Sequence, residues 1–265
     1  MELNSNELFL IAGPCVIESE EHCLKMAKEI KSICDKLQIP LIFKASFDKA
    51  NRTSALSYRG VGIDKGLKIL KKVKDAYKLP ILTDVHETWQ CKLVAEVADI
   101  IQIPAFLCRQ TDLLVEAAKT QKYINIKKGQ FCSVETMIHA YNKIFEEGNE
   151  KIMITERGNM YGYGDLIVDF RNLVRLNENT DAIVIQDTTH CLQQPNQSRE
   201  TLGERKFMPY LARAAVAVGV HGLFIEVHDN PEMALSDSTT QWYLHKLEEL
   251  LKDLKEIHKL KKKYE

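Results

Sequence analysis

Short apolar runs alternate with longer amphipathic segments along the whole chain, and this alternation limits the possible fold more than any other feature. The apolar runs have the length and composition of strands, and they cover residues 8–12, 41–46, 81–85, 100–103, 124–127, 152–155, 182–186 and 222–226. The segments that follow them carry apolar residues at helical spacing, and they cover residues 20–37, 63–77, 88–97, 111–120, 134–147, 166–176, 207–218 and 240–259. Strands that alternate with helices indicate parallel βαβ units.

Eight such pairs in a chain of 265 residues predict an α/β fold, a (β/α)8 TIM barrel, in preference to an open doubly wound sheet. The first apolar run is not followed by GxGxxG, the glycine pattern of dinucleotide-binding sheets. The sequence contains no linker, low-complexity tract or internal repeat. We therefore expect a single domain that spans residues 1–265.

Composition and charge argue against several classes of partner. Charged residues make up 28% of the chain and the net charge is −1, which is typical of a globular protein without a surface for nucleic acid or anionic membranes. The seven cysteines are scattered and form no CxxC pair, which favours a reducing compartment. The N-terminal apolar run is too short and too poorly flanked for a signal peptide, and no segment approaches membrane-spanning length. We therefore expect a cytoplasmic protein.

The sequence FKASFDKANRTS places three cations directly after the second predicted strand. The cations are Lys44, Lys49 and Arg52, and the hydroxyl and amide side chains among them are Ser46, Asn51, Thr53 and Ser54. Ammonium and guanidinium groups neutralise phosphate, and Arg does so through two parallel hydrogen bonds. The stretch therefore indicates a phosphorylated, oxygen-rich metabolite, although its composition also suits a solvated loop.

Polar clusters also follow the other predicted strands, at the end of the barrel where active groups of this fold lie. In the fifth predicted strand, Asn125 and Lys127 share one face and two Ile residues share the other. We expect the Ile residues to meet the helices, Lys127 to point into the barrel mouth and Lys128 to point into solvent. Lys44, Lys127 and Arg157 would then crowd positive charge at one mouth, and we expect a phosphate and a carboxylate of the substrate to neutralise it.

Four potential metal ligands follow the first, seventh and eighth predicted strands, which are neighbours in a closed barrel. They are Cys15, His190, Glu226 and Asp237. A thiolate, an imidazole and two carboxylates suit a divalent transition ion such as Zn, Fe, Mn or Co. Spacing alone leaves a small buried cysteine and a hydrogen-bonding histidine open as alternatives.

The remaining histidines and the two tryptophans carry weaker predictions. Surface or packing positions on helices are expected for His22, His139, His245 and His258. Positions near the mouth, beside the residues of the site, are expected for His86 and His228. Trp89 and Trp242 are expected to be packing anchors.

Eight motifs, taken in chain order, resemble the 3-deoxy-D-manno-octulosonate 8-phosphate synthase family. They are AGPCVIES, FKASFDKANRTS, YRGxG, TDVHE, QIPAFLCRQTDLL, NIKKGQF, TERGxxYGY and FIEVHDNPxxALSDSTTQ, and they span residues 12–241. The resemblance implies a homotetrameric (β/α)8 barrel that condenses phosphoenolpyruvate with arabinose 5-phosphate and releases inorganic phosphate, on the route to bacterial lipopolysaccharide. Related heptulosonate phosphate synthases typically carry a KPRTS-type loop in place of FDKANRTS.

The resemblance also implies roles for individual residues. Phosphoenolpyruvate would be held by Lys44, Lys127 and Arg157, with Gln102 and Ala105 nearby and Arg109 reaching in from a neighbouring subunit. The sugar phosphate would be held by Asn51, Arg52, Thr53 and Ser54. Lys49 would lie between the substrates and handle protons, with His190 and Asp237 as the other catalytic residues. The remaining substrate-binding positions would be Ser46, Asp84, Phe106 and His190.

Cys15 follows Gly-Pro, where metal-dependent members of the family carry Cys and metal-independent members carry Asn. The resemblance therefore implies a divalent metal ion held by Cys15, His190, Glu226 and Asp237. The loop after the seventh strand departs from the family pattern, because only Gly203 precedes Arg205 where a Gly-rich segment is usual.

Three other functions remain open. A heptulosonate phosphate synthase would use erythrose 4-phosphate as its second substrate. An aldolase of a different class would form a Schiff base at Lys127. A barrel without turnover would only bind phosphorylated sugars.

Overall fold

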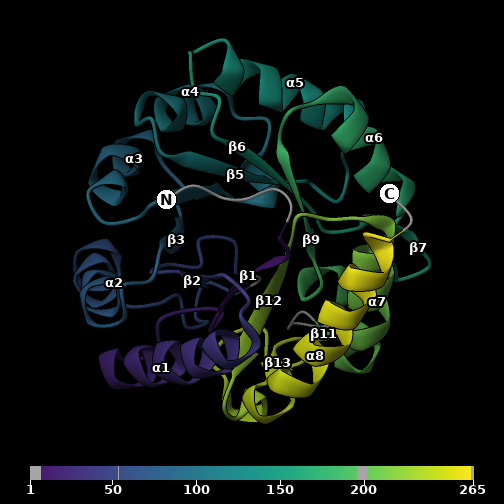
Figure 1. Cartoon of the computed structure of the whole chain (residues 1–265). Coiled ribbons are helices and arrows are strands. Elements are labelled where there is room, and N and C mark those ends of the chain that lie inside the picture. The colour runs from purple at the N-terminus through teal and green to yellow at the C-terminus, as the bar shows by residue number, and fades with distance from the viewer. Residues whose placement is uncertain (1–6, 53, 196–201, 264–265) are drawn as a thin grey trace.

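The computed structural model describes residues 7–52, 54–195 and 202–263, and its parallel strands close into a barrel (Figure 1). The strands, in order around the barrel, are β1 (Phe9–Gly13), β2 (Leu41–Lys44), β3 (Ile81–Asp84), β4 (Ile100–Ile103), β5 (Tyr123–Lys127), β6 (Ile152–Glu156), β9 (Ile183–Asp187) and β12 (Gly222–His228). The barrel closes where β12 pairs in parallel with β1, with Gly13 beside Glu226. The predicted (β/α)8 fold is confirmed.

The helices form a ring outside the barrel (Figure 1). They are α1 (Glu20–Leu37), α2 (Ile63–Tyr77), α3 (Thr88–Ala95), α4 (Thr111–Lys119), α5 (Val134–Phe145), α6 (Arg171–Asn179), α7 (Met208–Val218) and α8 (Leu244–Lys261). In α1, the buried residues recur three or four positions apart, from Cys23 to Leu37, so one stripe of the helix packs on the strands. Ser19 caps this helix by accepting the His22 N–H.

The inward-facing side chains of the barrel change from apolar to polar towards the C-terminal ends of the strands. The apolar layer consists of Phe9, Ile11, Ile42, Leu82, Ile100, Met153, Ile185 and Phe224. The buried polar residues two positions further along their strands are Lys44, Asp84, Gln102, Thr155, Asp187 and Glu226. Because side chains alternate along a strand, these polar groups share the interior of one barrel mouth.

The two faces of β5 are occupied as expected. Ile124 and Ile126 lie in the core between strands and helices. Asn125 lies inside the barrel, where it donates to Gln102 Oε1 at 3.1 Å and accepts the Thr155 hydroxyl at 2.7 Å. The alternation read from the sequence is therefore confirmed for this strand.

Two helices begin later than predicted. The helix expected over residues 166–176 begins only at Arg171, because residues Asp165–Ile167 form β8 and pair antiparallel with β7 (Asn159–Gly162). The turn between them places Tyr163 and Gly164 at φ of 59° and 109°, the positive values that two-residue hairpins favour. The helix expected over residues 240–259 begins at Leu244, since β13 (Trp242–Tyr243) first pairs with the end of β12.

Several smaller predictions can be compared with the structure. All seven cysteines are free and buried. Trp242 is 8% exposed and confirms its predicted packing, whereas Trp89 is 58% exposed and that prediction is wrong. No helix within the described ranges has the length and apolar character needed to cross a membrane.

Candidate active site

A cavity of about 480 Å³ opens at the C-terminal ends of the barrel strands. The predicted site residues that line it are Lys44, Lys49, Asn51, Arg52, Asp84, Gln102, Ala105, Phe106, Lys127, Arg157, His190, Glu226 and Asp237. Most of them end a strand or lie in the loop that follows it, so the barrel brings together residues that are far apart in the sequence. Their roles in binding and catalysis remain predictions.

Three other predicted substrate-binding residues, Ser46, Ser54 and Arg109, do not line this cavity. Ser46 is fully buried below it, and its carbonyl accepts the Ile17 N–H. Ser54 and Arg109 are exposed outside the cavity. Thr53 lies outside the described residues.

Lys44, at the end of β2, is neutralised by a carboxylate of the protein itself. Its Nζ lies 2.6 Å from Glu226 Oε1 and donates to the Cys15 carbonyl at 2.8 Å, and the side chains of Lys44 and Glu226 are buried. Burial favours the neutral acid, but Lys44, followed by His190 and Lys49, outweighs burial and lowers the pKa of Glu226. Glu226 is therefore an ionised group within the barrel.

Asp187, at the end of β9, holds both Lys127 and His190. Its Oδ2 lies 2.5 Å from Lys127 Nζ and 2.7 Å from His190 Nδ1. Burial opposes ionisation, yet His190 and Lys127 hold the pKa of Asp187 well below its usual value. The ionised carboxylate accepts a hydrogen bond from the His190 Nδ1–H, and the lone pair on Nε2 is then able to bind a metal ion. Sequence reasoning gave Asp187 no role, although it begins the motif Asp-Thr-Thr-His.

The expectation that substrate anions must neutralise Lys44 and Lys127 is wrong, because Glu226 and Asp187 already do so. Arg157 differs from these two lysines. It donates to two neutral amides, Gln130 Oε1 at 2.8 Å and Gln193 Oε1 at 2.7 Å, and it forms no ion pair with any described residue.

The charge of Arg157 is therefore available to an anionic ligand. Both glutamines line the cavity, and sequence reasoning assigned a role to neither. Gln130 lies in the motif NIKKGQF, which could have drawn attention to it. Gln193 begins the short strand β10 (Gln193–Gln194), and no local pattern indicates its contact with Arg157.

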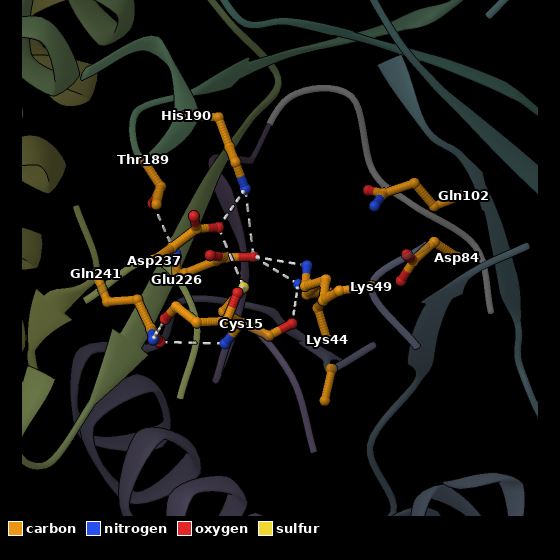
Figure 2. A network of polar contacts seen from close by, with 12 residues as sticks. Cys15, Lys44, Lys49, Asp84, Gln102, Thr189, His190, Glu226, Asp237 and Gln241 are labelled. Atoms are coloured by element: carbon orange, nitrogen blue, oxygen red, sulfur yellow. Dashed lines mark hydrogen bonds and ion pairs between the residues drawn. The ribbon is translucent and has the colours of Figure 1, made fainter. Parts of the chain in front are cut away.

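The four predicted metal ligands converge on one side of the cavity (Figure 2). Ligand atoms of Cys15, Glu226 and Asp237 lie within 4.8 Å of one another. His190 Nε2 lies 3.4 Å from Asp237 Oδ2 and 3.6 Å from Glu226 Oε1, and Cys15 Sγ lies 3.2 Å from Asp237 Oδ2. Tetrahedral ligands at bond lengths of 2.0–2.3 Å lie about 3.3–3.8 Å apart. The contacts of His190 with Asp237 and Glu226 fall in this range, although His190 is outside the group of three residues whose ligand atoms all lie within 4.8 Å of one another. Cys15, Glu226 and Asp237 are therefore the compact part of a site that suits a zinc-like ion.

Two further observations support this fit. Glu226 Oε2 is buried and forms no hydrogen bond with the described residues, so it is available as a ligand atom. Burial, followed by the charges of Asp237 and Glu226, raises the pKa of the Cys15 thiol, so the thiol keeps its proton until a cation displaces it.

Gln241 connects the two chain segments that carry these ligands. Its Oε1 accepts the Cys15 N–H at 3.1 Å, and its Nε2 donates to the Ser236 carbonyl at 2.8 Å (Figure 2). The Asp237 carbonyl accepts the Thr240 and Gln241 N–H groups and so fixes the backbone of Asp237, whose φ is 47°. Asp is among the few residues besides Gly that tolerate such a value. Sequence reasoning assigned Gln241 no role.

Lys49 lies beside Lys44 and Glu226, and Asp84 lies further from His190 (Figure 2). Lys49 Nζ lies 3.9 Å from Glu226 Oε1. Burial favours the neutral amine, but Cys15 and the nearby carboxylates, led by Glu226, outweigh burial and raise the pKa of Lys49. Asp84 contacts His86 Nε2 at 3.1 Å. His86, which also lines the cavity, therefore lies beside the site as expected.

Lys128 is completely buried, so the prediction that it points into solvent is wrong. Its Nζ donates to Asn159 Oδ1 at 2.8 Å and to the Gly158 carbonyl at 3.1 Å, and it lies 3.2 Å from Glu156 Oε1. β5 ends at Lys127, so the alternation of a strand no longer determines where the next side chain points. Lys128 instead holds the loop that begins with Arg157.

Comparison with known proteins is consistent with this geometry. The pattern of the DAHP synthetase I family matches residues 3–263. A protein of Pisum sativum named 2-dehydro-3-deoxyphosphooctonate aldolase is 57% identical over 97% of this chain and 91% of its own length. An Arabidopsis thaliana protein named 2-dehydro-3-deoxyphosphooctonate aldolase 1 is 58% identical over 96% of this chain and 89% of its own.

Bacterial proteins share the same name. That of Cyanothece sp. is 53% identical over 92% of this chain and 90% of its own length. That of Legionella pneumophila (strain Paris) is 51% identical over 97% of this chain and 94% of its own. The chain therefore belongs to the DAHP synthetase I family and, within it, to the family of the 2-dehydro-3-deoxyphosphooctonate aldolases.

Proposed function

We propose that this protein condenses phosphoenolpyruvate with D-arabinose 5-phosphate and water to give 3-deoxy-D-manno-octulosonate 8-phosphate and inorganic phosphate, a step in lipopolysaccharide biosynthesis. The observation that carries this proposal is a cavity lined by the cations Lys49, Arg52 and Arg157 together with an imidazole and two carboxylates. The Cys15 thiol lies directly behind this lining, 3.2 Å from Asp237 Oδ2. The shared name of the relatives supports the same product.

Both substrates are anionic, so the cations at the mouth would offset their repulsion and hold them in reacting positions. Arg157 would bind the carboxylate or phosphate of phosphoenolpyruvate through two parallel hydrogen bonds, since only neutral amides hold it in the free protein. Lys44 and Lys127 would bind the same substrate. Arg52, which donates to the Ser236 hydroxyl at 2.8 Å, would bind the sugar phosphate together with Asn51.

The reaction forms one carbon–carbon bond and breaks one carbon–oxygen bond. The methylene carbon of phosphoenolpyruvate bonds to the aldehyde carbon of the sugar, water adds to the former enol carbon, and the resulting hemiketal phosphate loses inorganic phosphate. The aldehyde oxygen gains a proton, and the water loses one. Lys49 is the proposed proton donor, because its ammonium group lines the cavity, 3.9 Å from Glu226 Oε1.

The proposed metal ligands are Cys15, His190, Glu226 and Asp237, whose spacing and donor types suit Zn, Fe, Mn or Co. A bound divalent ion supplies Lewis-acid polarisation of the sugar aldehyde. Asp187 would keep His190 Nε2 directed at the ion by accepting the proton on Nδ1.

A phosphate-release assay tests both parts of the proposal. We expect turnover of phosphoenolpyruvate with arabinose 5-phosphate and much slower turnover with erythrose 4-phosphate. Thorough chelation is expected to abolish turnover, and added divalent ions are expected to restore it. Faster turnover with erythrose 4-phosphate would contradict the proposed sugar substrate. Full activity after chelation would contradict the proposal that turnover requires a divalent metal ion. A Schiff base forms only from a neutral amine, whereas Lys127 donates a hydrogen bond to the Asp187 carboxylate. Borohydride is therefore expected to trap no substrate adduct at Lys127.

We further propose a cytoplasmic homotetramer in which Arg109 reaches a neighbouring site. Phe106 lines the cavity and is 48% exposed, and it packs near the equally exposed Phe131, so the rim offers apolar surface to another subunit. Sedimentation tests the assembly. Mixed oligomers of Arg109→Ala and Lys49→Ala chains are expected to regain activity, since each chain supplies the residue that the other lacks. Mixing without any gain would contradict the shared site.

A further inference from the structure

Two histidines and a carboxylate gather outside the cavity, where α1 begins and β12 ends. Ligand atoms of Glu18, His22 and His228 lie within 4.8 Å of one another, and none of these residues lines the cavity. His228 is 4% exposed, and the two imidazole rings lie 4.4 Å apart between their centroids. Sequence reasoning expected His22 to be a surface or packing residue and His228 to lie beside the active site.

Asp229 determines which ring nitrogens of the two histidines are available. Its Oδ1 lies 3.1 Å from His22 Nε2 and 3.1 Å from His228 Nδ1, and Lys25 donates to its Oδ2 at 2.6 Å. In the tautomers that carry protons on these two ring nitrogens, both N–H groups donate hydrogen bonds to Asp229, and lone pairs remain on His22 Nδ1 and His228 Nε2. The Asn230 N–H donates to His228 Nδ1 at 3.0 Å and to Asp229 Oδ1 at 3.1 Å, so a proton on His228 Nδ1 requires this N–H to donate to Asp229 Oδ1 alone.

The two nitrogens with lone pairs are also the two that lack partners. Both His22 Nδ1 and His228 Nε2 are buried and form no hydrogen bond with the described residues. A carboxylate that accepts the other ring N–H is the usual companion of a metal-binding histidine. The geometry therefore presents two oriented and unused nitrogen ligands.

Glu18 provides a third ligand and the negative charge. Its Oε1 lies 3.3 Å from His228 Nε2, close to the separation of about 3.4 Å between tetrahedral ligands with 2.1 Å bonds. A carboxylate oxygen and a nitrogen lone pair repel each other at this distance unless a proton or a metal ion lies between them. Glu18 and Asp229 carry two negative charges and Lys25 one positive charge, so the cluster is left with one negative charge, which favours a cation.

We propose that Glu18, His22 and His228 form a second metal site, for zinc or a similar transition ion, and that Asp229 orients its two histidines. Glu18 Oε1 also accepts the Leu235 N–H at 2.9 Å, two residues before the active-site Asp237. An ion bound here connects the start of α1 to the segment that carries Asp237. Because the unfolded chain lacks this arrangement, binding also stabilises the fold.

Zinc binding to the metal-free, full-length protein tests the proposal by equilibrium dialysis and elemental analysis. We expect about two zinc ions per chain in the wild type and about one in either Cys15→Ala or His22→Ala. His139→Ala is the matched control, since this histidine is exposed on α5, and it is expected to keep both. Asp229→Asn should weaken the second site about 10- to 100-fold. Equal zinc binding by His22→Ala and His139→Ala would overturn the proposal.

Cobalt(II) distinguishes the two sites, because only the Cys15 site has a sulfur ligand. The Cys15→Ala protein is expected to bind cobalt with ligand-field bands but without a thiolate charge-transfer band, and the His22→Ala protein to keep that band. His22→Ala retains the backbone bond to the Ser19 cap, so we expect it to fold. If the His22→Ala protein fails to fold, the spectrum of the Cys15→Ala protein alone shows whether the second site binds cobalt. If His228 is instead a protonated imidazolium between Glu18 and Asp229, Cys15→Ala binds no cobalt and the proposal fails.

Discussion

Replacing Lys128 by Met tests whether a buried charge, rather than packing alone, holds the loop that carries Arg157. Met keeps the length of the side chain and removes the ammonium group. The change deletes the hydrogen bonds to Asn159 and Gly158 and leaves Glu156, itself fully buried, without its positive partner. Removing one partner of a buried ion pair typically costs about 3–5 kcal/mol.

The contacts that remain place the expected loss near the lower end of this range. Glu156 keeps the N–H groups of Arg157 and Gly158 at 2.9 and 2.7 Å and the Asn172 amide at 3.1 Å. We therefore expect Lys128→Met to lower the free energy of unfolding by about 3 kcal/mol. At roughly 2–4 °C per kcal/mol for a chain of this size, the melting temperature should fall by about 6–12 °C.

Urea unfolding followed by circular dichroism, with chelator present so that metal binding does not contribute, measures this loss. Lys119→Met is the control, because Lys119 forms an exposed pair with Glu116 and its loss should cost under about 0.5 kcal/mol. The double variant Lys128→Met, Glu156→Gln should recover part of the loss, since it removes the uncompensated charge. A Lys128→Met protein within about 1 kcal/mol of the control would refute the reasoning.

Three further predictions concern the cavity. Gln193→Ala removes a 2.7 Å bond to Arg157 and should raise the KM for phosphoenolpyruvate about fivefold with a smaller change in kcat, measured by steady-state kinetics. Asp187→Asn no longer fixes His190 and should weaken metal binding about 10- to 100-fold in competition with a chelator. Burial opposes ionisation of Asp84, but His86 and then Lys49 lower its pKa, so its stabilising effect is present above about pH 4 and is lost as the pH falls further. Unfolding measured between about pH 4 and pH 2 should therefore show a shallower loss of stability in Asp84→Asn than in the wild type.

The barrel and much of the site were predictable because both follow from local periodicity. Alternation along a strand, together with the rule that active groups lie at the C-terminal ends, predicted that Lys44, Lys127 and Glu226 would share one mouth. The spacing of apolar residues likewise predicted α1 and α2 with the bounds that the structure has. These predictions needed no knowledge of which strands are neighbours.

The contacts between side chains were not predictable in this way. The pairing of Lys127 with Asp187 depends on the distance across the barrel interior between strands that are not adjacent. Lys128 lies beyond the end of β5, and Gln193 lies in the two-residue strand β10, which is too short for a period to determine the direction of its side chain. The end of β8, Leu166 and Ile167, was assigned to a helix, because the hairpin turn before it depends on the positive φ of Tyr163 and Gly164, which apolar spacing does not reveal.

Glu226 connects the cationic part of the site to the metal-binding part. Its Oε1 lies 2.6 Å from Lys44 Nζ, 3.9 Å from Lys49 Nζ and 3.6 Å from His190 Nε2, whereas its buried Oε2 has no hydrogen-bond partner among the described residues. One oxygen thus organises the cations, and the other is available to an ion. A positive ion at Oε2 reduces the attraction of Glu226 for Lys44 and Lys49, and more of their charge then acts on the substrate. We therefore propose that metal binding and anion binding would be coupled through this carboxylate, and that the coupling would act in both directions.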